Sequence, residues 1–228
     1  MVQKDMTWEA FERIAAQLRP GHVSLQGEGE PTLWPHFYKA AKMLHKKHPM
    51  MTIINGSRID VHNLSSYFVY VGVSIDTLDP VAAKDVGRYN LDKVLSNVES
   101  LINVMHGRLV IHTTDYGQDL TALKEYCSVR RLRHVIQPLQ KKDDYVKVYP
   151  IHWLAKTNTV KEASSYHCNY LDTDKMDFYT VDGELRPCCM MKTKLEVTKQ
   201  ELKDSLASGV ILTNCAGCSN IRVKQHTG

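Results

Sequence analysis

The chain has 228 residues, a length that suits one domain or one domain with a small appendage. Hydrophobic residues make up 43% of it and charged residues 24%, which is ordinary for a globular protein and argues against disorder. The net charge of +4 gives no electrostatic reason to expect a nucleic-acid partner. The sequence shows no signal peptide and no apolar stretch of the roughly 18 residues that a membrane helix needs. We therefore expect a cytoplasmic protein without a membrane segment, in a reducing compartment where structural disulfides are uncommon.

Five short apolar or β-branched runs in the first two-thirds of the chain are expected to be strands. They are residues 23–25, 51–54, 68–75, 109–111 and 134–136. Between them lie stretches whose apolar residues have helical spacing, such as Phe11, Ile14 and Leu18. Because apolar runs separated by helices are typical of buried parallel strands, we predict an α/β fold with a parallel sheet built from βα units.

A different composition begins after about Tyr149. The segment 178–186 predicts a hairpin around the two-residue turn Asp182-Gly183, and a short helix is expected from about Thr198 to Leu206. We expect a small α+β unit here, with the boundary between Asp143 and Lys161. The two predicted units are residues 1–149 and residues 150–228.

Four of the six cysteines have a spacing that predicts a metal centre. Cys168, Cys188, Cys215 and Cys218 follow the pattern Cys-x19-Cys-x26-Cys-x2-Cys. Gly217 lies inside the last pair and can adopt the positive φ that lets two thiolates reach one centre from a tight turn. Four soft thiolates suit an iron–sulfur cluster or a structural zinc ion, and unrelated buried thiols are the third interpretation. The coordination rules favour the iron–sulfur cluster.

Two neighbours of these cysteines are less certain ligands. If Cys188 ends a strand, Cys189 is expected to point away from it and to be a spare thiol. His167, beside Cys168, is either an alternative ligand or an ordinary loop histidine. Spacing alone does not decide whether either replaces a cysteine ligand.

Polar segments follow three of the predicted strands directly. They are Gly27-Glu28-Gly29-Glu30-Pro31, Asn55-Gly56 and Ser74-Ile75-Asp76. Because the carboxyl ends of parallel strands meet at one edge, where α/β folds bind their ligands, we expect these segments to line one pocket. Taken alone, the first segment also fits a turn in which Pro31 and Thr32 start a helix. The candidate ligand-binding residues are Gly27, Gly29, Glu30, Asn55, Ser74 and Asp76.

In this order, these segments and Arg88 before a helix resemble the radical S-adenosylmethionine (SAM) superfamily. The end of the chain, with Cys168, the segment 182–189 and the Cys215–Cys218 pair, resembles its SPASM/twitch extension, which holds an auxiliary [4Fe–4S] cluster. The resemblance spans about residues 7 to 220.

The resemblance implies a partial (β/α)6 barrel that binds SAM at the carboxyl ends of its strands. Gly29-Glu30-Pro31 matches the segment that contacts the methionyl ammonium, and the Ser74-x-Asp76 strand end matches one that lies near the ribose. Cys168, Cys188, Cys215 and Cys218 match the auxiliary-cluster ligands. The intact protein would form a 5′-deoxyadenosyl radical that abstracts hydrogen from a small-molecule or peptide substrate. Flavodoxin or ferredoxin would be its electron donor.

The chain departs from the family at one defining motif. The Cys-x3-Cys-x2-Cys motif that holds the SAM-cleaving cluster normally precedes the helix that begins here near Thr7, but the first cysteine of this chain is Cys127. We expect truncation, because loss of the first strand would leave an exposed parallel edge; the alternative is a degenerate member of the family. The chain as written is expected to be inactive in radical chemistry, and no catalytic residue is assigned. A non-catalytic iron–sulfur electron carrier and a zinc-stabilised binding module are the alternatives from other functional classes.

Overall fold

The computed structural model describes residues 4–27, 29–139, 163–173, 176–190, 197–218 and 220–224. It divides into two compact units, Met1–Gln137 and Pro138–Gly228. The predicted division at residues 149 and 150 falls within residues 140–162, which lie outside the described residues, so it stays a prediction. Each unit is described by itself below.

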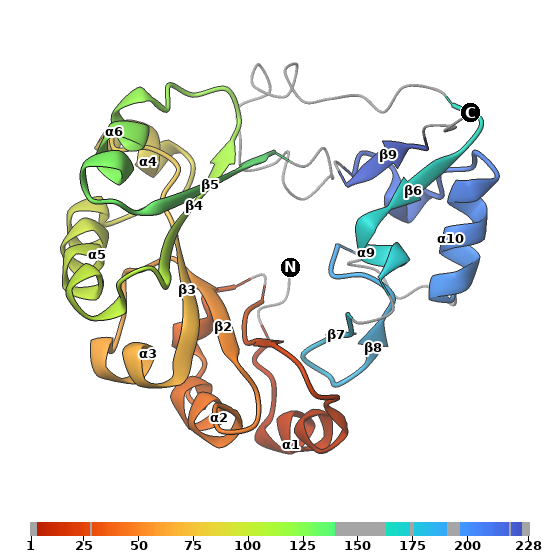
Figure 1. The fold of residues 1–228 in the computed structure, drawn as a ribbon, viewed down its shortest axis with the longest axis horizontal. Helices are drawn as coiled ribbons and strands as arrows, with labels where there is room; N and C mark the ends of the chain where they lie inside the picture. The colour runs from red at the N-terminus through yellow and green to blue at the C-terminus, as the bar shows by residue number, and fades with distance from the viewer. Residues whose placement is uncertain are drawn as a thin grey trace. The chain divides into compact units, whose positions relative to one another are not determined.

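The first unit is built on a five-stranded sheet in the order β1-β2-β3-β4-β5 (Figure 1). The pairs β1–β2, β2–β3 and β3–β4 are parallel. The five predicted strands and the α/β fold class are confirmed. The strands are β1 (Val23–Ser24), β2 (Met50–Ile54), β3 (Phe68–Ser74), β4 (Leu109–Asp115) and β5 (Arg133–Pro138).

Helices connect these strands, and several of them begin with a side-chain cap. Thr7 accepts a hydrogen bond from Ala10 N at 3.2 Å before α1, and Asp60 accepts one from Asn63 N at 2.9 Å before α3. Asp79 caps α4, whose first residue is Pro80. The helices are α1 (Trp8–Gln17), η1 (Pro31–Leu33), α2 (Phe37–Leu44), α3 (Val61–Tyr67), α4 (Pro80–Asp85), α5 (Leu91–Met105) and α6 (Thr121–Val129).

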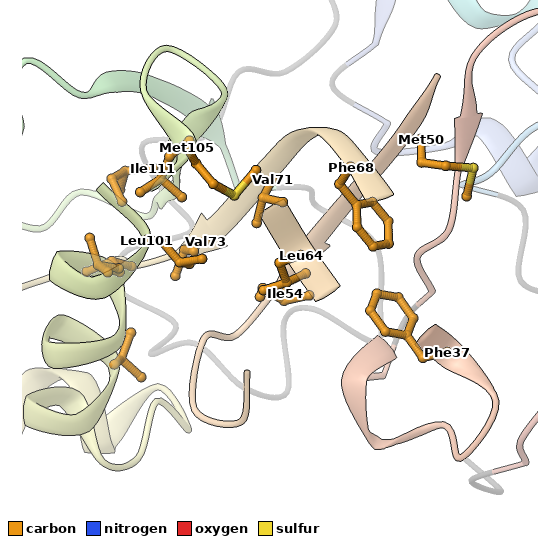
Figure 2. Close-up of a cluster of buried hydrophobic side chains, with 14 of the residues drawn as sticks. Phe37, Met50, Ile54, Leu64, Phe68, Val71, Val73, Leu101, Met105 and Ile111 are labelled. Atoms are coloured by element: carbon orange, nitrogen blue, oxygen red, sulfur yellow. The ribbon is translucent and has the colours of Figure 1, made fainter. Parts of the chain in front are cut away.

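The main hydrophobic core lies between one face of the sheet and the helices. Figure 2 shows Val71 and Val73 of β3 among Leu64 of α3 and Leu101 and Met105 of α5. Phe37 of α2 stacks on Phe68, with ring centroids 5.4 Å apart. This burial supplies the main stabilisation of the unit, since the free energy gained grows with the apolar area removed from water.

A bulge in β3 sets which of its residues face the helices. Met50 pairs with Phe68, but the next residue of β2, Met51, pairs with Tyr70, so Val69 is an extra residue. Phe68 and Val71 can therefore both face the core although they are three positions apart. Successive strand residues alternate between faces, so Tyr70, Gly72 and Ser74 lie on the opposite face of the sheet.

The second unit has its own small core. Strand β6 (Tyr166–Cys168) pairs antiparallel with β9 (Ile221–Val223). Leu171, Leu202 and Leu206 pack with Ile221 and three of the cysteines. The remaining elements are α9 (Asn169–Asp172), β7 (Phe178–Tyr179), β8 (Leu185–Arg186), α10 (Lys199–Ala207) and η2 (Thr213–Cys215).

The predicted hairpin and helix of this unit are both confirmed. Strands β7 and β8 pair antiparallel, and Gly183 takes φ +82° in the turn between them. Thr198 and Glu201 form a capping box at the start of α10. In the described parts of both units, no helix is long and apolar enough to cross a membrane.

Candidate functional site

Glu30 joins the loop after β1 to the end of β2. Its Oε2 accepts a hydrogen bond from Asn55 N at 2.5 Å. Its Oε1 accepts from Thr32 N at 3.2 Å and from Thr32 Oγ1 at 2.5 Å, which caps η1. The turn-and-cap interpretation of this segment is confirmed, and Glu30 also connects two of the predicted polar segments. The ligand-binding interpretation stays a prediction.

The glycines around Glu30 leave space beside the backbone. Apart from its chain neighbours, a Cβ placed on Gly27 or Gly29 would have no atom of the described residues within 4 Å. Packing therefore does not require glycine at either position, and the backbone of this loop is open to a close approach. Glu28, between them, lies outside the described residues.

The turn after β2 is built by Asn55 and Gly56. Asn55 Oδ1 accepts hydrogen bonds from Ser57 N and Ser57 Oγ, both at 2.8 Å, as in an Asx turn. Gly56 takes φ +77°, and a Cβ there would lie 2.7 Å from Val73 Cγ1. Asn97 Nδ2 of α5 donates to Gly56 O at 2.8 Å. The Asn55 amide oxygen is therefore used by the protein itself, and Gly56 is required by both conformation and space.

Asp76 is the centre of a buried network after β3. The residue is 1% exposed. Its Oδ2 accepts from Arg88 Nε and its Oδ1 from Thr114 N, each at 2.8 Å. Gln118 Nε2 donates to Asp76 O at 2.9 Å. Because its carboxylate is held by these donors, Asp76 positions Arg88, whose side chain stays 33% exposed.

The structure brings the predicted strand-end residues to one edge of the sheet. Glu30 contacts Asn55, and Ser74 is the last residue of the neighbouring strand β3, directly before the Asp76 network. We call Glu30, Asn55, Ser74, Asp76 and Arg88 the strand-end cluster. Arg88 entered the sequence argument only through motif order; its contact with Asp76 adds it to the site.

Three polar residues on the opposite face of the sheet were missed by the sequence analysis. Tyr70 Oη and His112 Nε2 share a hydrogen bond of 2.5 Å, with their rings edge to face. Arg133 of β5 lies close enough to shift the pKa of both groups. The alternation of Tyr70, Gly72 and Ser74 along one strand was the available signal, but the bulge at Val69 hides that pattern.

Three of the four predicted metal-ligand cysteines lie in one buried cluster of the second unit. Cys168 ends β6, Cys188 follows β8 and Cys218 precedes β9, and all three are buried, with Cys215 packed against the cluster. Burial raises the pKa of the Cys168 thiol; backbone N–H groups of Leu171 and Tyr170 oppose this, and the neighbouring thiols of Cys188 and Cys218 add to it. The Cys188 and Cys218 thiols are therefore close enough to Cys168 to disfavour its charged form.

Their donor chemistry fits a thiolate-bound metal, although the geometry is not that of a formed site. Met190 N donates to Cys188 Sγ at 3.4 Å and Asn220 Nδ2 to Cys218 Sγ at 3.8 Å, contacts that favour thiolates. However, among the residues that the structure describes, no group of three or more Cys, His, Asp or Glu is arranged to hold a metal ion. The ligand set stays a prediction.

The expected orientation of Cys189 stays a prediction. Cys188 is buried and Cys189 is exposed, and interaction with the Cys188 thiol raises the pKa of Cys189. The prediction assumed that Cys188 ends a strand, but β8 ends at Arg186, so strand alternation does not apply. His167 lies in β6, where its Nδ1 is 3.2 Å from Asp172 Oδ2.

The parallel α/β sheet with polar groups collected at its strand ends defines a class of ligand-binding domain. The sequence profile described as Radical SAM superfamily matches residues 2–129. The chain therefore belongs to the radical SAM superfamily, and this family implies an iron–sulfur cluster and SAM. The matched residues contain one cysteine, Cys127, which is buried in α6 and whose pKa is raised by burial to about 11.

Comparison with other known proteins gives distant matches. No curated protein sequence matches the chain. The solved structure of native anSMEcpe with bound AdoMet and Cp18Cys peptide matches 59% of this chain and 44% of its own, with 20% identity and a TM-score of 0.47. Native anSMEcpe with bound AdoMet matches 63% of this chain and 47% of its own, with 20% identity and a TM-score of 0.46. The chain thus spans less than half the length of these structures.

Proposed function

We propose that the first unit binds SAM at the strand-end cluster, as part of a radical SAM partial barrel. The observation that carries this proposal is the 2.5 Å hydrogen bond from Asn55 N to Glu30 Oε2, which joins two family motifs at the carboxyl ends of β1 and β2. Family membership supports it, because the matched residues contain the whole cluster. Ligands of parallel α/β sheets bind at this edge.

Each part of the strand-end cluster has a role in this proposal. The open backbone at Gly27 and Gly29 lets the methionyl ammonium approach, and Glu30 fixes the shape of that loop. Ser74 and the Asp76 network lie near the ribose. Arg88, held by Asp76 and still a third exposed, supplies a cation beside the ligand.

In the intact protein, SAM held by the strand-end cluster would, on one-electron reduction to methionine and a 5′-deoxyadenosyl radical, supply the radical for hydrogen abstraction from a small-molecule or peptide substrate. The outcome is an oxidation or a modification of that substrate, with flavodoxin or ferredoxin as electron donor. The 228 residues contain no Cys-x3-Cys-x2-Cys motif, so we propose binding of SAM, and not its cleavage, for these residues alone. We expect a cytoplasmic protein that does not bind nucleic acid.

For the second unit we propose a SPASM/twitch-type extension whose Cys168, Cys188, Cys215 and Cys218 hold an auxiliary [4Fe–4S] cluster. Burial of three of these thiols beside one another, with N–H donors at two sulfurs, supports it. Such a cluster would accept the substrate electron or position the substrate. A structural zinc ion uses the same donor set and is the alternative.

Isothermal titration of the 228-residue chain with SAM tests the first proposal. We expect binding, and we expect Glu30→Gln to weaken it by roughly tenfold, because glutamine has one acceptor oxygen where the carboxylate has two. Glu99→Gln is the matched control, since Glu99 is an exposed carboxylate that pairs with Arg130 on the helices. No SAM binding by the folded wild-type chain would refute the proposal.

Metal analysis after anaerobic purification tests the second proposal, the auxiliary cluster. An auxiliary cluster predicts about four iron atoms per chain and a brown protein, lost in Cys215→Ser/Cys218→Ser and kept in Cys127→Ala. One zinc ion and no iron would establish the zinc-stabilised alternative. A reducible cluster in a chain that does not bind SAM would favour a non-catalytic electron carrier.

A further inference from the structure

The opposite face of the sheet carries a second polar group, none of whose members belongs to the strand-end cluster. It consists of Tyr70 on β3, His112 on β4 and Arg133 on β5, and we call it the opposite-face group. Tyr70 precedes Ser74 by four residues on the same strand, a separation of about 13 Å along β3. His112 pairs with Ser74 in the register of the sheet, so the group begins beside the strand-end cluster and extends along this face toward Tyr70.

Gly72 makes room for the histidine of this group. In the register of the sheet His112 stands opposite Ser74, yet its ring leans back over Gly72 toward Tyr70. A Cβ on Gly72 would lie 2.7 Å from His112 Cδ2 and 3.1 Å from its Nε2. The absence of a side chain at Gly72 is thus what lets the ring lie along the face and reach Tyr70.

Near neutral pH the Tyr70–His112 pair carries no charge. Burial lowers the pKa of His112, and Arg133 and then His134 lower it further. Burial raises the pKa of Tyr70, against a smaller effect of Arg133. The ring is therefore a neutral imidazole and the phenol keeps its proton.

Arg133 is then the cation of this face. It is exposed, and none of the carboxylates in the described part of the chain pairs with it. Ile53, whose Cγ1 would lie 3.0 Å from a Cβ on Gly72, makes the neighbouring surface apolar. One guanidinium beside two neutral hydrogen-bonding groups and an apolar wall suits a singly charged, planar anion.

We propose that the opposite-face group binds a carboxylate of the substrate. Arg133 supplies the charge and the fork of N–H donors, and the Tyr70–His112 pair supplies hydrogen bonds from its neutral groups. The identification of this ligand as the substrate rests on the proposed function. The substrate class is thus narrowed to small molecules or peptides that present a free carboxylate to the sheet.

The test titrates the 228-residue chain with N-acetylglycine and with the uncharged N-acetylglycinamide. Binding is followed through the ¹⁵N resonances of the His112 ring, assigned by their loss in His112→Gln. We expect the carboxylate to shift them and the amide to leave them unchanged. Arg133→Gln should weaken carboxylate binding about tenfold or more, because a charge-assisted interaction is lost. Arg131→Gln, which removes an exposed arginine from the turn before β5, should change nothing.

Two further variants test whether carboxylate binding depends on the Tyr70–His112 contact. Tyr70→Phe removes the Oη contact, and Gly72→Ala displaces the ring, so each should reduce the response of His112 to N-acetylglycine. Equal responses to carboxylate and amide, or an unchanged response in Arg133→Gln, would overturn the proposal. Inorganic phosphate binding as tightly as N-acetylglycine would overturn the assignment to a carboxylate.

SAM titrations on the same samples separate this inference from the proposed function. Arg133→Gln should bind SAM as the wild type does, because Arg133 is not part of the strand-end cluster. SAM binding without carboxylate preference overturns the opposite-face proposal alone. Carboxylate preference without SAM binding supports the anion site and overturns the proposed function.

Discussion

The two units place their candidate sites in different relations to their cores. In the first unit the core lies between the sheet and the helices. The strand-end cluster lies at the edge of the sheet, where hydrogen bonds within the protein already fix its carboxylates. In the second unit Cys168, Cys188 and Cys218 are themselves members of a small core. The first site is therefore a product of topology, whereas the proposed second site would depend on the metal that its thiols bind, because small cores often need a metal for stability.

Metal removal should have the largest effect, and that effect should be confined to the second unit. We expect chelation, or Cys218→Ser, to speed hydrogen exchange of the β6 and β9 amides by ~100-fold or more, because metal binding contributes directly to the folding of such units. Exchange in β3 should stay unchanged. Equal loss of protection in both units would show that no metal stabilises the second unit separately.

Loss of the Asp76 carboxylate should have the next largest effect. Asp76→Ala removes the acceptor of Arg88 Nε and Thr114 N from a buried position. We expect the free energy of unfolding of the first unit to fall by about 3 kcal/mol, measured by urea denaturation. Glu99→Ala breaks the exposed pair with Arg130 and should cost less than about 1 kcal/mol. Similar costs for the two variants would contradict the structural role of Asp76.

Two glycines with almost the same φ allow the cost of backbone strain to be measured separately from the cost of a close contact. Gly56 has φ +77° and a neighbouring Val73 methyl 2.7 Å from an added Cβ, whereas Gly87 has φ +76° and open space. Gly87→Ala should cost about 1 kcal/mol from strain alone. Gly56→Ala should cost about 2–3 kcal/mol, because the clash adds to the strain. Thermal unfolding of both variants checks this, and equal shifts would show that the Val73 contact relaxes.

The smallest expected effect is a pH dependence of the first unit. The pKa values of His112 and His134 are both lowered, mainly by burial. Below about pH 6.5 the unfolded chain therefore binds protons that the folded unit does not, so stability falls as the pH decreases. Each histidine can contribute at most about 1.4 kcal/mol per pH unit.

His112→Gln should flatten the stability profile of the first unit between pH 7.5 and 5.5. Urea unfolding at several pH values measures this profile. His22→Gln is a suitable control, because His22 is exposed. An unchanged slope in His112→Gln would contradict the neutral, half-buried state of that ring.

The sequence predicted the first unit well because its signals are local. The five strands are apolar runs, and the polar segments that follow three of them need only the rule that parallel strands end at one edge. The partners of Asp76 could not be predicted, since Thr114 and Gln118 come from the next strand and its loop. Tyr70 and His112 were missed because a bulge changes the alternation of β3 and leaves no mark in the sequence.

In the second unit the elements were predictable but the end of one strand was not. Asp182-Gly183 and Thr198 are strong local signals, and both the hairpin and the helix are present. The direction of Cys189 depended on where β8 ends, and strand ends are set by tertiary contacts that the sequence does not reveal.

Hydrogen exchange of the 228-residue chain with and without SAM tests the central claim most directly. We predict that SAM slows exchange in the loop around Gly29, at Asn55 and at Thr114, which together mark the strand-end cluster, and leaves β6 and α10 unchanged. Slowing confined to the second unit, or no slowing anywhere, would contradict the claim that the sheet edge of the first unit is the SAM site.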